Sequence, residues 1–207
     1  MVNGALDGRL ARGSARRGLL LDAAVRVVAG AGSGALTHRA VAAEAKVSLA
    51  SVTYHFPSIA ELRRETLTHA GSSIGLELAD LVSAASVNID DTPEICAAYA
   101  VRLVGERRIE TAAVFELIVA AAHDEDLRPV VAFYQGMLAD LLTPYEGAQG
   151  RAQTVAAAVQ GLLLVHMVSP FPADPSDLRE AVADLIRRYR ANGPAAEGRQ
   201  RSDERII

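Results

Sequence analysis

Polar side chains that can contact a nucleic acid are concentrated in residues 36–62, LTHRAVAAEAKVSLASVTYHFPSIAEL. Two short helical patterns in this stretch are separated by a turn of only a few residues, which is the spacing of a helix-turn-helix. Val41, Ala45, Val47 and Val52 can form one buried apolar set. The other side chains then lie on the outer face or at the helix ends, where they can reach phosphates and base edges. These candidates for DNA contact are Thr37, His38, Arg39, Lys46, Ser48, Leu49, Ala50, Ser51, Thr53, Tyr54 and His55.

The stretch resembles the amino-terminal DNA-binding domain of the TetR (tetracycline-repressor) family. The family pattern is Thr-x-x-x-(Ile/Val)-Ala, then Ala-Gly-Val-Ser, then Tyr-x-His-Phe, then Lys and Leu. Three residues depart from it, because Lys46 stands at the glycine position, Thr53 at a tyrosine position and Ile59 at the lysine position. A left-handed conformation at Lys46 costs roughly 1 to 2 kcal/mol. The residues that match are Thr37, Val41, Ala42, Ala45, Val47, Ser48, Tyr54, His55, Phe56 and Leu62.

The resemblance implies an all-α fold of about nine helices, three for DNA binding and about six for effector binding and dimerisation. It also implies a cytoplasmic, homodimeric transcriptional regulator, most often a repressor, that binds a palindromic double-stranded DNA operator and is released by a small apolar effector. The predicted division is a disordered basic arm over 1–15, a helix-turn-helix domain over 16–62, a ligand-binding and dimerisation domain over 63–191, and a disordered tail over 192–207. The alternative is a helical small-molecule-binding or scaffolding protein of the same fold without DNA binding.

Helical periodicity and capping residues predict a succession of helices without a convincing strand. The first helix covers 18–31 and ends in a glycine-rich stretch. Thr37 and Ser48 are suited to cap the next two helices. Residues 58–61 have the form of a capping box that starts a long helix running to about residue 84. Further helices are predicted to start at Thr92, to cover 109–123, 126–145 and 152–168, and to start again after Asp174.

Charge is distributed unevenly along the chain. Residues 1–69 contain nine Lys and Arg against five Asp and Glu, a net charge of +4, whereas residues 70–207 contain twelve against twenty, a net charge of −8. Because phosphates attract the basic part and repel the acidic part, this pattern orients the chain toward DNA. Arg12, Arg16 and Arg17 either contact phosphates or the minor groove, or belong to a solvated tail.

The region from 70 to 170 combines apolar helices with isolated polar or aromatic side chains. Such a set suits a mainly apolar ligand fixed by a few polar contacts, with Arg102 or His166 meeting an acid or carbonyl group. Each residue taken singly also fits a packed core. The candidates for ligand binding are Tyr99, Arg102, Phe115, Glu116, His123, Tyr134, Met137 and His166.

Residues 155–168 are apolar nearly all round, which indicates a helix that is buried in its own domain, against a second subunit, or both. In the TetR family the last two helices form a four-helix bundle with those of a twofold partner. The resemblance therefore implies a dimer interface that includes Ala156, Val159, Leu163 and Met167.

The remaining motifs favour structural roles. Residues 30–34, GAGSG, end a helix instead of following a strand, which argues against a nucleotide-binding loop. The acids of 123–126 precede a helix, where acids cap more often than they bind a metal. Cys96 is the only cysteine, which excludes an internal disulfide and favours a packed thiol in a reducing compartment. The sequence contains no catalytic motif and no run long enough to cross a bilayer, so we expect no enzyme, metal, cofactor or membrane partner.

Overall fold

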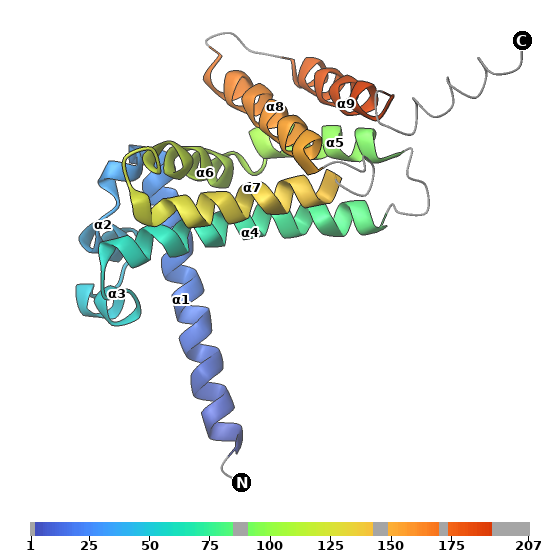
Figure 1. The fold of residues 1–207 in the computed structure, drawn as a ribbon. Helices are drawn as coiled ribbons and strands as arrows, with labels where there is room; N and C mark the ends of the chain where they lie inside the picture. Colours follow the sequence, from blue (N-terminus) through green and yellow to red (C-terminus); the bar gives the residue numbers. More distant parts are fainter. Residues whose placement is uncertain (1–2, 85–90, 143–148, 170–173, 192–207) are drawn as a thin grey trace, which may run out of the picture. The chain divides into compact units, whose positions relative to one another are not determined.

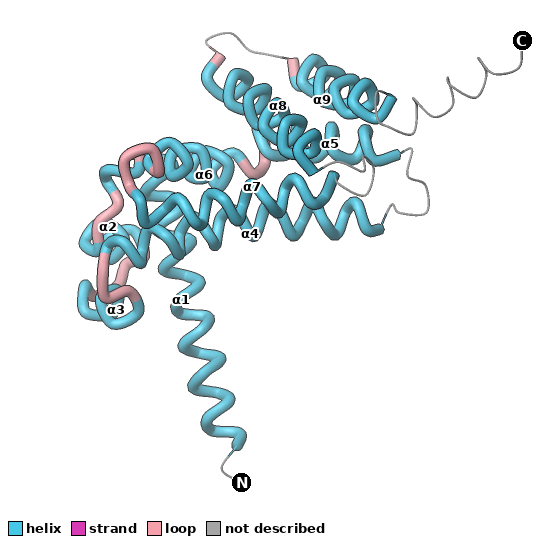
Figure 2. Tube along the Cα trace, in the orientation of Figure 1, coloured by secondary structure: helices cyan, strands magenta, loops and turns pink. Residues whose placement is uncertain are grey.

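The fold is all-α in the part of the chain that the structure, a computed structural model, describes: residues 3–84, 91–142, 149–169 and 174–191. Figures 1 and 2 show helices and no strands in these residues, as the sequence predicts. None of the described helices is both long and apolar enough to span a membrane. The α-helices are α1 (Asn3–Ala31), α2 (His38–Glu44), α3 (Leu49–His55), α4 (Ile59–Ala84), α5 (Thr92–Val104), α6 (Arg108–Ala120), α7 (Arg128–Leu142), α8 (Gln149–Val168) and α9 (Pro175–Ala191), and the short 3₁₀ helices are η1 (Ser33–Ala35) and η3 (Glu125–Leu127).

The helices form two compact units, and the boundary between the units falls within α4 and α7. The first unit contains the chain up to Ser73 together with Ile109–Val131, and the second contains Ile74–Arg108 and the chain from Ala132 onward. This division differs from the predicted one, which placed everything after residue 62 in one domain. The reason is that α6 supplies core residues such as Leu117 to the first unit. The sequence does not reveal that α6 packs with the first helices, because they are far apart along the chain.

The amino-terminal segment is helical, because α1 begins at Asn3. The prediction of a disordered arm over residues 1–15 is therefore wrong from Asn3 onward. Ala, Leu and Arg, which are strong helix formers, recur among residues 5–17. Extending an existing helix also avoids the cost of nucleating a new one. The tail predicted over 192–207 lies outside the described residues.

Glycine ends α1, as the sequence predicts. Gly32 has a φ of 82°, a left-handed conformation that favours glycine. Its backbone N–H donates to the Val28 carbonyl oxygen at 2.8 Å. The GAGSG stretch is thus a helix terminus that leads into η1, which is the structural role predicted for it.

Side-chain caps start the helices that follow. The Thr37 Oγ1 accepts from the Ala40 backbone N–H at 3.1 Å, and the Ser48 Oγ accepts from the Ser51 N–H at 3.2 Å. The Ser58 Oγ accepts from the Glu61 N–H at 3.1 Å and starts α4. Each such cap contributes about 1 kcal/mol. The predicted caps at Thr37, Ser48 and Ser58 are confirmed.

The turn between α2 and α3 contains a strained residue. Lys46 has a φ of 54°, the left-handed conformation that the family's glycine adopts without strain. A Cβ is disfavoured in this conformation, so the turn is less stable than it would be with glycine.

Replacing Lys46 with glycine is expected to stabilise the protein by about 1 kcal/mol, because relief of this strain exceeds the added flexibility of the unfolded chain. Chemical denaturation of the wild-type and Lys46→Gly proteins would measure the gain. Lys46→Ala removes the charge but keeps the Cβ and is the matched control. An equal gain from Lys46→Ala would show that charge, not backbone strain, limits the stability of this turn.

In the second unit, α5 packs against both α8 and α9, as Figure 1 also shows. Ion pairs connect α9 to α5, because Glu94 pairs with Arg187 and lies 3.6 Å from the Arg179 Nη2. The amides of Gln135 on α7 and Gln160 on α8 exchange hydrogen bonds of 3.1 and 3.3 Å. These contacts fix the helices that surround a cavity.

Candidate functional site

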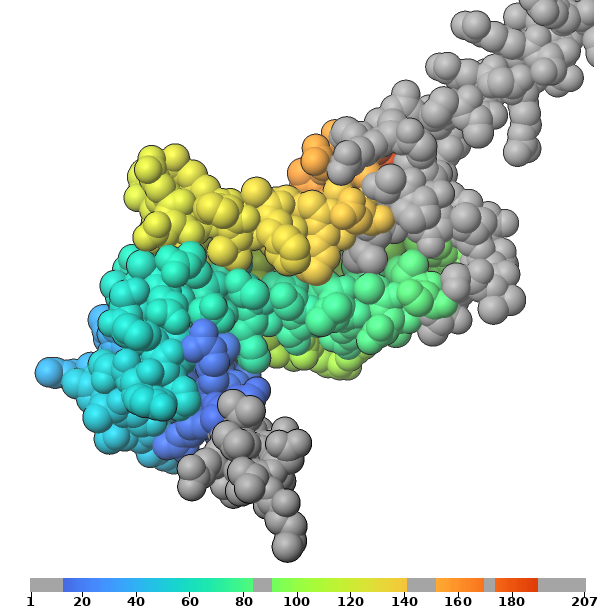
Figure 3. Space-filling view, turned by 60° about the horizontal axis from the view of Figure 1, so that its bottom comes forward, coloured from blue at the N-terminus to red at the C-terminus, as the bar shows by residue number. Residues whose placement is uncertain are grey.

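The first candidate site is the outer surface of α3. Tyr54 is 82% exposed, and Leu49, Ala50 and Thr53 are also exposed on this short helix. On the inner side Val52 is fully buried, so the helix is anchored by one face and presents the other. In Figure 3 the blue and cyan atoms of the first helices form an open surface. Such a surface can enter a DNA groove.

Arg17 on α1 holds the end of α3 in place. Its Nη1 donates to the His55 carbonyl oxygen at 2.7 Å, and its guanidinium lies 4.3 Å from the centre of the Phe56 ring. Its Nη2 is 3.1 Å from the Glu65 carboxylate and 3.8 Å from that of Glu61. Arg17 is therefore a positioning residue, and its predicted alternatives of a solvated tail or direct DNA contact do not fit these contacts. Arg16 is exposed, and nothing is described of the Arg12 side chain.

Some predicted DNA-contacting residues use their polar atoms within the domain. A ring nitrogen of His38 hydrogen bonds to the Phe56 carbonyl oxygen at 2.7 Å, so this half-buried residue supports the fold. The Thr53 hydroxyl donates back to the carbonyl oxygens of Leu49 and Ala50, each at 3.2 Å. The hydroxyls of Thr37 and Ser48 cap helices, as described above. The predicted residues whose side chains are exposed are Arg39, Lys46, Leu49, Ala50 and Tyr54, and Ser51 and His55 are half-buried.

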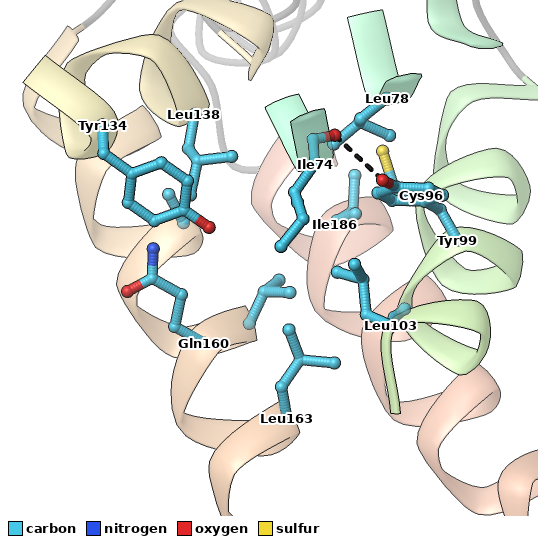
Figure 4. Close-up of a pocket in the computed structure, with 13 residues that line it drawn as sticks. Ile74, Leu78, Cys96, Tyr99, Leu103, Tyr134, Leu138, Gln160, Leu163 and Ile186 are labelled. Atoms are coloured by element: carbon cyan, nitrogen blue, oxygen red, sulfur yellow. Dashed lines mark hydrogen bonds between the residues drawn. The ribbon is translucent and has the colours of Figure 1, made fainter. Parts of the chain in front are cut away.

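The second candidate site is a cavity of about 70 Å³ inside the second unit. Its wall is almost entirely apolar, as is usual for sites that bind small organic molecules. Figure 4 shows the lining side chains converging on this space. The lining residues are Ile74, Leu78, Cys96, Tyr99, Ala100, Leu103, Tyr134, Leu138, Ala156, Val159, Gln160, Leu163 and Ile186.

One wall of the cavity is fixed by hydrogen bonds. The Tyr99 hydroxyl donates to the Ile74 carbonyl oxygen at 2.9 Å and lies 3.1 Å from the Glu77 carboxylate. Burial raises the pKa of Tyr99, and the negative charge of Glu77 raises it further. The Glu77 carboxylate is also 2.8 Å from the Arg102 Nη1 and 3.6 Å from the Arg107 Nε. Tyr99 thus joins α5 to α4 through a fully partnered polar group.

Cys96 faces the cavity as an unreactive thiol. Burial raises its pKa to about 11, so the nucleophilic thiolate is scarce at neutral pH. This agrees with the prediction of a packed thiol. The acids of residues 123–126 also have the predicted structural role, because the Asp124 carboxylate accepts from the Asp126 N–H at 3.1 Å and lies 3.2 Å from the Arg63 Nη1. Within the described residues, no group of three or more His, Cys, Asp or Glu side chains is arranged to hold a metal ion.

The structure brings together only two of the residues predicted to bind a ligand, Tyr99 and Tyr134. Arg102 is instead paired with Glu77 and Glu106, and the Met137 side chain packs against Gly75. The prediction is wrong for these two residues as cavity-lining groups, because their helices turn them to other faces. His166 does not line the cavity either. Phe115, Glu116 and His123 belong to the first unit, where the Glu116 carboxylate accepts from the Ser33 N–H at 3.2 Å.

The residues predicted for a dimer interface all lie on α8, and the interface itself stays a prediction. Ala156, Val159 and Leu163 line the cavity of their own subunit, and Ala156 and Leu163 are buried there. Met167 is half-buried, and its carbonyl oxygen accepts from the Arg108 Nη2 at 2.9 Å. Helix α8 is apolar on both sides, so periodicity does not distinguish its inner face from its outer face.

Comparisons with known proteins identify the family of this chain. Residues 20–66 match the family model described as bacterial regulatory proteins, tetR family, and residues 89–189 match that of the tetracyclin repressor-like C-terminal domain. A solved member of the TetR family from Streptomyces coelicolor A3 is 31% identical, with a TM-score of 0.68, covering 83% of this chain and 98% of that chain. The chain belongs to the TetR family. It is therefore a DNA-binding transcriptional regulator with a helix-turn-helix and a ligand-binding domain, not an enzyme.

Other TetR-like structures contain ligands. The multidrug binding protein EbrR complexed with imidazole is 32% identical to this TetR-family chain, with a TM-score of 0.68, covering 83% of this chain and 94% of that one. The EbrR complex with ethidium is 30% identical, with a TM-score of 0.67 and coverages of 82% and 97%. The search of curated proteins found no match.

Sequence reasoning missed several functional residues of this TetR-family chain. Gln160 is the one amide in the apolar run 155–168, a signal that marks it as a polar group on the cavity wall. Arg17 carried no comparable signal, because its partners are about 40 residues away in sequence. The apolar lining residues, such as Leu138 and Ile186, look like ordinary core in sequence and are distinguished only by the space between them.

Proposed function

We propose that this TetR-family regulator is a cytoplasmic homodimeric repressor that binds a palindromic operator and is released by a small, mainly apolar effector. The observation that supports the switch is that α4 contributes residues to both units. Leu62 and Leu67 of this helix are buried in the first unit, whereas Ile74 and Leu78 line the cavity of the second. An effector that moves α4 therefore acts on the helix that also belongs to the DNA-binding unit. EbrR, which is bound to small molecules in its structures, supports an effector of this size class.

The effector must bind the DNA-incompetent state more tightly than the competent one. A hundredfold loss of operator affinity requires about 2.7 kcal/mol of coupling free energy. Tyr99 is well placed to contribute, because its ring lines the cavity while its hydroxyl holds the Ile74 carbonyl oxygen of α4. A ligand that displaces this ring breaks a contact with α4.

The proposed dimer uses the outer face of α8. Val165 is 67% exposed, and Leu164 and Val168 are also exposed large apolar residues. Ala157, Ala158 and Gly161 are exposed at the preceding helical spacings, so the face is continuous. We call the six residues 157, 158, 161, 164, 165 and 168 the outer α8 face. An exposed apolar stripe of this kind is suited to a twofold helix contact.

Selection from a library of random DNA duplexes would test the DNA-binding part of the proposal. We expect enrichment of palindromic sites whose half-site centres are about 10 base pairs apart, since two recognition helices of a dimer are then one DNA turn, ~34 Å, from each other. Half-sites without a palindrome would argue against a homodimer, and no enrichment would favour the alternative of a small-molecule-binding protein without DNA binding.

A further inference from the structure

The cavity of the second unit has an uncharged wall. Among the described residues that line it there is no Asp, Glu, Lys, Arg or His, and their polar groups are the hydroxyls of Tyr99 and Tyr134, the Cys96 thiol and the Gln160 amide. An ion that enters such a space loses its hydration without gaining a counter-charge. The apolar wall therefore disfavours the binding of both cations and anions.

The nearest acidic group on α4 is already neutralised. Glu77 follows the lining residue Ile74 by one helical turn, but its carboxylate is held by Arg102, Arg107 and the Tyr99 hydroxyl. Two guanidinium groups lie beside the Glu77 carboxylate. Its negative charge is therefore already paired and does not attract a cationic ligand. The thiol of Cys96 also remains neutral, since burial raises its pKa to about 11.

Tyr134 supplies one hydroxyl that has no hydrogen-bond partner among the residues that the structure describes. The residue is only 8% exposed, and Figure 4 shows its hydroxyl directed into the cavity on the side of the Gln160 amide. The described part of the chain contains no hydrogen-bond partner for this hydroxyl, and the two amides of Gln160 and Gln135 bond to each other. Burial raises the pKa of Tyr134 to about 12, so the group keeps its proton at neutral pH. A protonated hydroxyl that faces an apolar cavity can donate a hydrogen bond to an acceptor on a bound molecule.

We propose that the effector is an uncharged, mainly apolar molecule with one oxygen acceptor, such as a ketone, that accepts a hydrogen bond from the Tyr134 hydroxyl. This assignment rests on the proposed ligand-binding role of the cavity and specifies its chemistry. The apolar wall binds the body of the molecule, Tyr134 selects the oxygen, and the uncharged lining rejects ionised analogues.

Four probes of nearly equal shape test the assignment on the full-length protein by ligand-observed NMR titration. Acetophenone carries the oxygen acceptor, α-methylstyrene replaces that oxygen with a methylene group, and benzamidinium and benzoate carry a positive and a negative charge. We expect acetophenone to bind about tenfold more tightly than α-methylstyrene, which corresponds to one buried hydrogen bond, and the two ions not to bind.

Tyr134→Phe is expected to remove this tenfold preference, lowering the affinity for acetophenone and leaving that for α-methylstyrene in place. Tyr99→Phe is the matched control, because the Tyr99 hydroxyl is bonded to Ile74 and Glu77 and should not distinguish the two probes. The result compared between proteins is the ratio of the affinities for acetophenone and α-methylstyrene. Lower stability of a variant affects both affinities alike, so this ratio remains a valid test. Tight binding of benzamidinium or benzoate, an unchanged preference in Tyr134→Phe, or failure of all four probes to bind would overturn the assignment.

Operator binding, measured in parallel on the same samples, separates this inference from the proposed function. If acetophenone binds with the expected dependence on Tyr134 but operator DNA is not recognised, the ligand class stands and the proposed repressor does not. If operator DNA binds while the charged probes occupy the cavity, the repressor stands and the ligand class is wrong.

Discussion

Tyr54→Asp is expected to lower the affinity for operator DNA by at least about a hundredfold, since a carboxylate then replaces a hydroxyl that we propose contacts a phosphate. Tyr54 lies at the end of α3 with its ring 82% exposed, and that ring meets the His55 ring edge-on at 5.2 Å. The substitution leaves the buried anchors Val52 and Phe56 in place. Fluorescence anisotropy at controlled salt concentration would measure the loss, and circular dichroism would show whether the helices remain folded.

Milder variants separate positioning from base recognition. Tyr54→Phe should weaken all DNA sequences by a similar factor, because a phosphate contact carries no base information. Ser51→Ala should instead change base preference, because Ser51 lies in the first turn of α3, which we place nearest the base edges. The matched control for Tyr54→Asp is Val119→Asp, which adds the same negative charge at an exposed position on α6. If Val119→Asp weakened binding as much as Tyr54→Asp, net charge and not the α3 surface would explain the loss.

Val165→Arg is expected to convert the proposed dimer into monomers and to reduce affinity for the full palindrome by about a hundredfold or more, because the second half-site is then no longer bound intramolecularly. The substitution introduces a charge into the centre of the outer α8 face, where Val165 is 67% exposed in the single chain. Sedimentation velocity would report the change of mass. Binding to an isolated half-site should change little, since α3 is unaffected.

Two further arginine variants define the surface. Leu76→Arg, on α4, replaces a similarly exposed apolar residue and should remain dimeric. Leu163→Arg places the charge in the cavity wall, so it should lower the melting temperature of the second unit instead of acting only on assembly. A Val165→Arg protein that stays dimeric would exclude the outer α8 face from the interface.

Local signals in the sequence determined the DNA-binding half of this protein. Thr37, Ser48 and Ser58 cap the helices they were predicted to cap, because a cap depends on a residue and the backbone N–H three positions later. Lys46 adopts the left-handed conformation expected at the glycine position of the motif. A long helix after Ser58 was also predicted from its capping box, and α4 covers Ile59–Ala84 of the described residues.

Other features depend on contacts between segments that are distant in sequence. Arg17 became a support for α3 only because folding brings His55 and Glu65 to it. Residues 109–131 joined the first unit through packing that no local pattern encodes. Helix α8 shows the limit most clearly: its apolar residues occur on every side, so sequence periodicity could not assign its faces. Packing against α5 and α9 turned Leu163 into the cavity and left Val165 outside, because burial depends on which surfaces a helix meets after folding.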